Sequence, residues 1–303
     1  MRLWLPMSDA VERMGGVPVG VDVDVYDGVG PVPGSADEVE FYVLPYMAGS
    51  GPARLMRDLP MLRVGQTLTA GVDDFLPHVP DGVTLCNARG VHDASTAELA
   101  VTLMLASLRG VPQFVRGQDR HEWAGRRAES LADKTVLIVG HGSVGGAVER
   151  RLGGFECDVL RVARTPRDGV SAISDIADLL PRADVVVLTV PMTSETVCLV
   201  DAAFLAAMKD GALLVNVARG PVVETDALVA ELRTGRLLAA LDVTDPEPLP
   251  ADHELWTLPG VLISPHVGGN SSAFLPRAMA LVADQLRRYV SGMPLRNVIT
   301  GPY

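Results

Sequence analysis

A glycine-rich segment, Gly140-His141-Gly142-Ser143-Val144-Gly145, has the GxGxxG spacing of a loop that holds a dinucleotide. It directly follows the β-branched run Thr135–Val139 and opens an amphipathic helical pattern. The first glycine permits a tight turn, the second lets the backbone approach a pyrophosphate, and the third lets the helix pack closely on the strand. Three glycines in an ordinary loop are the alternative interpretation, but the strand before them and the helix after them favour dinucleotide binding.

The helix that follows this loop supplies the other part of the predicted phosphate site. At a helix N-terminus, free backbone N–H groups and the positive end of the helix dipole attract anions. Ser143 and Val144 lie in the first turn and are therefore predicted to contact the cofactor together with the three glycines.

The next predicted strand ends at Val162-Ala163-Arg164-Thr165, about 20 residues further on, where an acidic residue would hold the adenosine ribose. Ala163 occupies the position where that acidic residue is expected. Arg164 offers charge-assisted hydrogen bonds to a ribose 2′-phosphate, and Thr165 can add another. A solvated surface arginine is the alternative, but the pattern favours NADP over NAD. Arg161 and Arg167 are near enough in sequence to reinforce the positive field, although strand alternation can direct Arg161 elsewhere.

Three further segments place polar residues directly after predicted strands. They are Asn216-Val217-Ala218-Arg219-Gly220, Asp242-Val243-Thr244-Asp245-Pro246-Glu247-Pro248 and Ser264-Pro265-His266-Val267-Gly268-Gly269. Ligands bind at the carboxyl ends of the strands in open parallel sheets. If each residue is considered alone, the simpler interpretation is a surface charge for Arg219, a turn residue for Glu247 and a hydrogen-bonded histidine at a strand end for His266. Taken jointly, at three strand ends, they predict a reacting centre.

Six apolar, largely β-branched runs predict the sheet that positions these residues. They are Thr135–Val139, Val159–Ala163, Val185–Val190, Leu213–Val217, Leu238–Val243 and Val261–Ser264. Because the runs are apolar throughout, both faces of the sheet are expected to be covered. Helical patterns lie between them, including Val144–Leu152 and Asp226–Leu232, the second preceded by Thr225 as a capping residue. This alternation predicts an α/β fold with a Rossmann-type, doubly wound parallel sheet.

The first hundred residues carry weaker strand signals, separated by Gly/Pro-rich stretches such as Gly28–Gly34. Strands are predicted near Leu3 and at Phe41–Leu44, Leu62–Val64 and Val83–Cys86. This part of the chain is therefore predicted to form a second, smaller α/β domain.

A long helix is predicted to bridge the two domains, because Ser95 and Glu98 have the spacing of a capping box and an apolar stripe follows. The stripe consists of Ala97, Val101, Met104, Leu105 and Leu108. A second helical pattern, about Ser271 to Val290, is expected to return the chain to the first domain. The predicted domains are residues 1–95 with 271–303, and residues 96–270 for the dinucleotide.

Together with Gly140–Gly145 and Val190-Pro191-Met192-Thr193, the three polar segments resemble the D-2-hydroxyacid dehydrogenases. This family includes D-lactate, D-glycerate/hydroxypyruvate, glyoxylate and phosphoglycerate enzymes. The resemblance covers roughly residues 66–290, and the first sixty residues match weakly. It implies hydride transfer between NAD(P)H and a small 2-keto acid, or the reverse from a D-2-hydroxy acid. It also implies a flavodoxin-like substrate domain and a homodimer formed through the cofactor domain.

The resemblance gives three residues catalytic roles. Arg219 would hold the substrate carboxylate and carbonyl, a task suited to the fixed fork of donors on a guanidinium. His266 would be the acid that protonates the ketone oxygen as hydride arrives at carbon. Glu247 would keep His266 protonated, because a nearby carboxylate raises the pKa of an imidazole. Formate-oxidising relatives carry Gln in place of this carboxylate, so Glu247 favours keto-acid chemistry.

The resemblance also assigns residues that bind cofactor and substrate. Asp242 would contact the nicotinamide end of the cofactor, and further cofactor contacts would come from Val190, Pro191, Ala218 and Gly268. Ala70 and Gly71, in Thr69-Ala70-Gly71-Val72-Asp73, resemble the loop whose backbone N–H groups receive the substrate carboxylate. Some family members are instead corepressors that bind partners through the cofactor-bound fold. A nucleotide-sensing interaction protein without significant turnover is therefore the alternative function.

The overall charge argues against polyanionic partners. The chain of 303 residues has a formal net charge of -11, with 26 Lys and Arg against 37 Asp and Glu. Its field therefore repels nucleic acid and anionic membranes. Cys86, Cys157 and Cys198 are far apart, with no Cys/His cluster at metal-binding spacing, so no metal site is expected. The apolar stretch before Asp9 is too short for a signal-peptide core, which favours a cytoplasmic protein.

Overall fold

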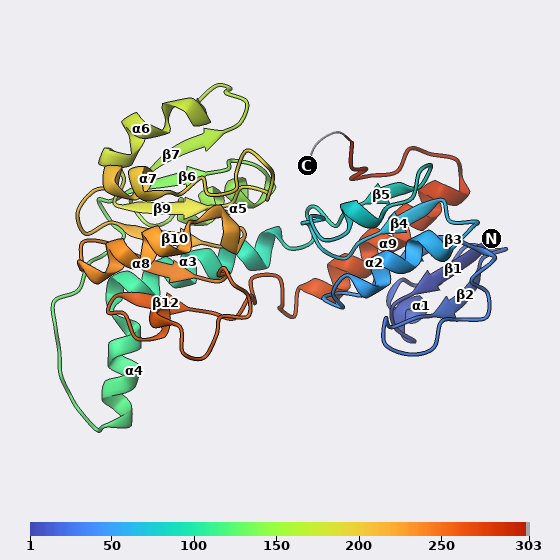
Figure 1. Cartoon of the computed structure of the whole chain (residues 1–303), viewed down its shortest axis with the longest axis horizontal. Helices are drawn as coiled ribbons and strands as arrows, with labels where there is room; N and C mark the ends of the chain where they lie inside the picture. Colours follow the sequence, from blue (N-terminus) through green and yellow to red (C-terminus); the bar gives the residue numbers. More distant parts are fainter. Residues whose placement is uncertain (301–303) are drawn as a thin grey trace. The chain divides into compact units, whose positions relative to one another are not determined.

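A computed structural model describes residues 1–300 of the chain. It contains two compact units, of which the larger is Asp93–Ser271 and the smaller combines Met1–His92 with the segment that begins at Ser272. Each unit is built on its own parallel sheet (Figure 1). These divisions lie within three residues of the boundaries predicted after residues 95 and 270. Residues 301–303 of the predicted 271–303 segment lie outside the described residues.

The larger unit contains a seven-stranded sheet in the order β12-β11-β10-β9-β6-β7-β8. The strands are β6 (Thr135–Val139), β7 (Asp158–Ala163), β8 (Ser171–Ala172), β9 (Val185–Leu188), β10 (Leu213–Asn216), β11 (Leu238–Leu241) and β12 (Val261–Ile263). Every neighbouring pair is parallel. Counted along the chain, the first six strands have the 3-2-1-4-5-6 order of a Rossmann fold, which confirms the predicted class. The two-residue strand β8 was not predicted, because it is too short to carry a periodic pattern.

Side chains of this sheet alternate between two cores. Val136 and Ile138 belong to one buried cluster, whereas Leu137 and Val139 belong to the other. Buried residues of α3 and α5 complete the first cluster, and residues of α7 and α8 complete the second. Coverage of both faces explains why central strands such as β6 and β9 are almost wholly apolar. The helices are α3 (Asp93–Arg109), α4 (Val111–Asp119), α5 (Ser143–Leu152), α6 (Ile176–Leu179), α7 (Ala202–Ala207) and α8 (Thr225–Arg233), with 3₁₀ turns η3 (Ile173–Asp175), η4 (Leu180–Arg182), η5 (Gly220–Val222) and η6 (Glu254–Trp256).

Two predicted helix caps are wrong. Helix α3 begins at Asp93, so Ser95 and Glu98 lie inside its first turns. Thr225 is the first helical residue of α8 rather than its cap. Its hydroxyl donates instead to the backbone oxygen of Asp245, at 2.7 Å. The loop after β11 offers this acceptor, a tertiary contact that local sequence does not reveal.

The smaller unit contains a five-stranded parallel sheet in the order β2-β1-β3-β4-β5, the flavodoxin-like order predicted for it. Its elements are β1 (Arg2–Leu5), α1 (Ala10–Arg13), β2 (Asp22–Val25), β3 (Val39–Val43), α2 (Gly51–Leu55), η1 (Met56–Asp58), β4 (Val64–Gln66), η2 (Leu76–His78), β5 (Thr84–Cys86) and α9 (Phe274–Val290). A strand is present near each of the four predicted places, although β4 begins at Val64, where the predicted strand ends. Strand β2 was missed because it lies at the sheet edge, where its alternating aspartates break the apolar pattern.

Helix α9 returns to the smaller unit, as predicted. Its residues Phe274, Met279 and Val282 are buried together with Leu3 and Phe41 of the five-stranded sheet. The apolar face of α9 therefore completes the core on one side of this sheet. Across residues 1–300, no helix is both long and apolar enough to cross a membrane.

Candidate active site

The glycine loop has the geometry that each glycine position requires. Gly140 has a φ of +103°, and a Cβ there would lie 2.6 Å from the backbone nitrogen of Val190. A Cβ on Gly145 would lie 2.5 Å from the Gly140 oxygen, so the start of α5 packs directly on the turn. Gly142 is the N-cap of α5. A Cβ on Gly142 would have no atom closer than the Gly140 oxygen, at 4.0 Å. The loop thus leaves an uncovered backbone surface at a helix N-terminus, which fits a pyrophosphate.

Hydrogen bonds hold this loop at the point where the strand order reverses. The N–H groups of Gly140 and His141 donate to the Val162 oxygen at the end of β7, at 2.9 and 2.8 Å. The Thr189 hydroxyl, after β9, donates to the Gly140 oxygen at 2.8 Å. Val190 and Pro191 follow directly, and the Val190 nitrogen lies beside Gly140. A switch point between parallel strands is where nucleotides bind in such sheets.

Asp242, at the end of β11, is a buried carboxylate that organises the neighbouring loop. Its side chain accepts hydrogen bonds from the Ser264 hydroxyl at 2.6 Å and from the N–H groups of Val267 and Gly268 at 2.9 and 2.8 Å. A Cβ on Gly268 would lie 2.9 Å from this carboxylate. Both Asp242 oxygens therefore fix the loop that carries His266.

His266 is held in an uncommon backbone conformation by the same contacts. Its φ is +50°, a region that a histidine adopts rarely. The His266 backbone N–H donates to the backbone oxygen of Asp242 at 2.8 Å, which ties this conformation to the end of β11. Its Nδ1 forms a hydrogen bond with the Glu247 carboxylate. This bond raises the pKa of His266, and burial opposes the rise.

Arg219 is positioned by a buried amide. Asn216, at the end of β10 and 1% exposed, accepts from the Ala218 N–H at 3.0 Å and donates to the Arg219 oxygen at 2.9 Å. Gly220 then allows close contact with the next loop, because a Cβ there would lie 1.9 Å from the Thr244 oxygen. The Glu247 hydrogen bond still raises the pKa of His266, and the positive charge of Arg219 partly opposes that rise.

The larger unit therefore brings Arg219, Glu247, His266 and Asp242 together at the carboxyl edge of one sheet. Sequence analysis gave no role to Asn216 or Ser264, although each is a polar residue directly after an apolar strand. Asn216 is buried and Ser264 is half-buried, and their hydrogen bonds show that they shape the loops around the predicted residues.

The remaining predicted residues belong to other segments of the chain. Arg164 is an exposed residue after β7, 4.0 Å from the Glu195 carboxylate, and Thr165 is exposed beside it. Ala70 and Gly71 belong to the smaller unit. The Asn87 amide and the Thr69 hydroxyl each donate to one of their carbonyl oxygens, at 2.7 Å in both cases, which fixes the turn.

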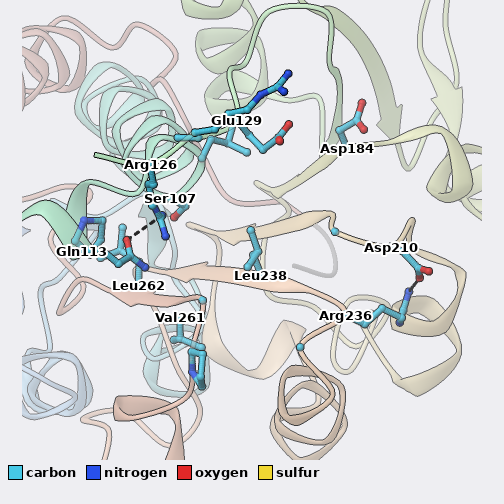
Figure 2. A pocket seen from close by; sticks show the side chains of 18 of the residues that line it. Ser107, Gln113, Arg126, Glu129, Asp184, Asp210, Arg236, Leu238, Val261 and Leu262 are labelled. Carbon is cyan, nitrogen blue, oxygen red and sulfur yellow. Dashed lines mark hydrogen bonds and ion pairs between the residues drawn. The ribbon is translucent and has the colours of Figure 1, made fainter. Parts of the chain in front are cut away.

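A cavity of about 710 Å³ lies at the opposite edge of the sheet, as Figure 2 shows. Its lining includes Lys134, Asp184, Gly211, Leu238 and Val261, which lie at the amino ends of the strands, and none of the predicted site residues. Ligands of parallel sheets bind at the carboxyl edge. This cavity is therefore not the predicted reacting centre.

Comparison with known proteins agrees with this geometry. Residues 101–268 match the family model described as "D-isomer specific 2-hydroxyacid dehydrogenase, NAD binding domain". The chain is 34% identical over 243 residues to D-3-phosphoglycerate dehydrogenase of Methanocaldococcus jannaschii, covering 77% of this chain and 46% of that protein. This chain thus spans about half the length of that relative.

Two further comparisons cover most of both partners. Glyoxylate/hydroxypyruvate reductase B of Yersinia pestis is 32% identical over 258 residues, covering 79% of this chain and 78% of that protein. A D-isomer specific 2-hydroxyacid dehydrogenase of Xanthobacter autotrophicus Py2, solved with NADPH and MES, superposes with a TM-score of 0.83 and 29% identity. It covers 99% of this chain and 97% of that one. The chain therefore belongs to the family of D-isomer specific 2-hydroxyacid dehydrogenases.

Proposed function

We propose that this protein is an NAD(P)-dependent oxidoreductase that reduces a small 2-keto acid, or oxidises the matching D-2-hydroxy acid. One observation carries the proposal: the imidazole of His266 is paired with Glu247, and the segment of Arg219 packs against the loop after β11, because Gly220 lies directly on the Thr244 backbone. This arrangement combines a proton donor with a cation that suits a carboxylate. It also stands in the same unit as the glycine loop.

The proposed chemistry assigns the cofactor one task and the protein the rest. When bound, the nicotinamide group supplies a hydride to carbon 2 of the substrate, or removes one from it. Arg219 holds the substrate carboxylate and polarises the carbonyl through charge-assisted hydrogen bonds. His266 protonates the ketone oxygen as negative charge develops there, and it accepts the proton in the reverse direction. The hydrogen bond that His266 donates to the Glu247 carboxylate keeps His266 protonated for the first role.

We assign the cofactor to the carboxyl edge of the larger unit. The glycine loop, Ser143 and Val144 would hold the pyrophosphate, with Val190, Pro191, Ala218, Asp242 and Gly268 as further contacts. NADP is the proposed cofactor in preference to NAD, because Ala163 replaces the acidic residue at the end of β7 and Arg164 and Thr165 follow it. The smaller unit, with Ala70 and Gly71, would be the substrate domain.

The test is turnover on a panel of 2-keto acids, namely glyoxylate, hydroxypyruvate, pyruvate and phenylpyruvate, with NADH and with NADPH. Steady cofactor oxidation that the His266→Ala variant abolishes would support the proposal. Absence of turnover on the whole panel, with intact cofactor binding, would instead support the corepressor-like alternative. That alternative has no specific support in the site, because the Arg219, Glu247 and His266 set is intact.

We also propose a homodimer formed through the larger unit. Figure 1 shows α4 projecting away from the sheet of this unit, with a long connection leading back to β6. Phe114 and Val115 on α4 are 43% and 53% exposed, and Trp123 in the connection is fully exposed. A second copy would cover this apolar surface. Light scattering of the wild type and of Phe114→Glu measures the mass, and a wild-type monomer at micromolar concentration would contradict the dimer.

A cytoplasmic location is proposed with this function. Cys86, Cys157 and Cys198 are all free thiols, as expected in a reducing compartment.

A further inference from the structure

Four charged or polar side chains connect the glycine loop to the chain after β7. The Arg167 guanidinium donates to Nδ1 of His141 at 2.9 Å and also to the His141 backbone oxygen. Nε2 of His141 lies 2.6 Å from Glu149 on α5. The other oxygen of Glu149 accepts from Nε of Arg161 on β7, also at 2.6 Å. We call these four residues, Arg167, His141, Glu149 and Arg161, the loop network.

The donors fix the proton on His141. A guanidinium can only donate, so Nδ1 of His141 must be the acceptor and Nε2 carries the hydrogen that Glu149 receives. Arg161 is the main cause that holds the pKa of the Glu149 carboxyl below its usual value. Glu149 is therefore an anion shared between Arg161 and His141, and it orients the imidazole toward Arg167.

The network separates the three arginines near the end of β7. Arg161 faces Glu149, which neutralises it. Arg164 lies 4.0 Å from Glu195, and both side chains are about two-thirds exposed, so that attraction is weak and solvent-screened. The described partners of Arg167 are both uncharged atoms of His141. Among the three, Arg167 has its positive charge least compensated by a carboxylate.

The backbone holds Arg167 in place while its side chain stays accessible. Its N–H donates to the Val170 oxygen at 3.1 Å, and the Val170 N–H donates back to the Arg167 oxygen at 2.8 Å. Gly169 completes this tight turn with a φ of +69°. Arg167 itself is exposed. Its guanidinium can therefore receive a further acceptor without a change in the fold.

We infer that Arg167 is the principal residue that recognises the 2′-phosphate of NADP, and that His141 is the positioning residue that holds its guanidinium there. This inference rests on the proposed cofactor preference. His141 is the second residue of the glycine motif, and its N–H bonds to the Val162 oxygen, so it marks the place where the adenosine ribose meets the end of β7. A phosphate dianion is a stronger acceptor for a guanidinium than a neutral imidazole. Only Nη2 of Arg167 contacts His141, so the other donors of the guanidinium can bind the phosphate while His141 keeps the group in place.

The matched ligands for the test are adenosine 2′,5′-bisphosphate and AMP, which differ only in the 2′-phosphate. Their Kd values are measured by titration calorimetry on wild type, Arg167→Ala, Arg164→Ala and Arg167→Lys. Loss of a charge-assisted contact weakens binding roughly ten- to a hundredfold. We expect that loss for the bisphosphate in Arg167→Ala, with AMP changed less than about twofold and a smaller bisphosphate loss in Arg164→Ala. Arg167→Lys should recover part of it, because it keeps the charge but not the fork.

His141 is tested through its coupling to Arg167. His141→Ala should weaken the bisphosphate in the wild-type background and have no further effect in Arg167→Ala, because the two act as one unit. His141→Gln, which keeps an acceptor, should restore part of the binding. Additive losses would remove His141 from the site.

The outcomes separate this inference from the proposals on which it rests. A wild type that prefers the bisphosphate and keeps this preference in Arg167→Ala would overturn the role of Arg167 and leave the NADP preference to Arg164 and Thr165. A wild type with equal affinity for both ligands would overturn the cofactor preference itself. Keto-acid turnover is measured separately, so its absence would overturn the proposed activity alone.

Discussion

The two edges of the seven-stranded sheet use polar side chains in different ways. At the amino edge, opposite charges pair with each other, as in Lys134 with Glu129 at 3.0 Å and Arg236 with Asp210 at 3.2 Å. At the carboxyl edge, Asp242 and Asn216 bond mainly to backbone groups. Pairing cancels charge, whereas side chain to backbone bonds fix the position of a loop. The large cavity is at the first edge and the proposed chemistry is at the second.

The strongest way to break this comparison is His266→Ala. A general acid contributes typically 10² to 10⁴-fold to rate, so kcat should fall by about that factor, while the Kd for NADPH changes little. Steady-state kinetics and cofactor titration measure the two quantities. A nearly unchanged kcat would show that the carboxyl edge positions His266 for some purpose other than catalysis.

Arg219→Ala should have the next largest effect. Removing a group that stabilises developing negative charge costs roughly 10² to 10³-fold, and here we expect the loss in kcat/KM for the keto acid. The control is Arg219→Lys, which keeps the charge but loses the bidentate fork and should recover only part of the activity. If kcat/KM were the same in wild type and Arg219→Ala, the substrate carboxylate would have to bind elsewhere.

Glu247→Gln should shift the pH profile. The Glu247 hydrogen bond raises the pKa of His266, so wild-type reduction persists to higher pH and is lost as pH rises through that pKa. In the variant the loss should begin at lower pH, because the amide does not stabilise the imidazolium. The measurement is kcat/KM for reduction against pH, which reports groups on the free enzyme. A profile that stays in place would mean that another group sets the pKa.

The smallest effect is expected at the amino edge, with Lys134→Ala. Its partner Glu129 is 71% exposed, so the pair should contribute less than about 1 kcal/mol to the free energy of unfolding. Turnover should be unchanged, since Lys134 lies at the edge away from the reacting residues. Urea unfolding and kcat measure the two effects, and a tenfold drop in kcat would contradict the functional division between the edges.

The sequence was most informative where a residue's environment is uniform along a whole element. Strands β6 and β9 are buried on both faces, so their apolar runs alone predicted them. The edge strand β2 has no buried residue and was missed. The order of motifs predicted Arg219, Glu247 and His266, but it could not show that Ser264 and Asn216 turn inward. A hydroxyl or an amide after a strand looks the same in sequence whether its partner is water or the neighbouring loop.

The same limit applies to the arginines after β7. The sequence alone does not distinguish the roles of Arg161, Arg164 and Arg167, and Arg164 lies next to the position expected to contact the adenosine ribose. Only the acceptors distinguish them, and these come from elements that are distant in sequence, namely Glu149 on α5 and His141 in the glycine loop.

The position of α9 has a consequence for synthesis on the ribosome. The core of the smaller unit contains Leu3 and Phe41 near the start of the chain and Met279 near its end, and the whole larger unit is translated between them. During synthesis, the segment Met1–His92 therefore lacks α9, the helix that covers one face of its sheet, until the larger unit has been translated. The larger unit is continuous in sequence, so it can fold before the smaller unit is complete. This reverses the usual order of synthesis, in which the N-terminal domain folds first. Ribosome-bound chains stopped before α9 should expose this apolar sheet face to chaperones, and release of the last helix should end that exposure.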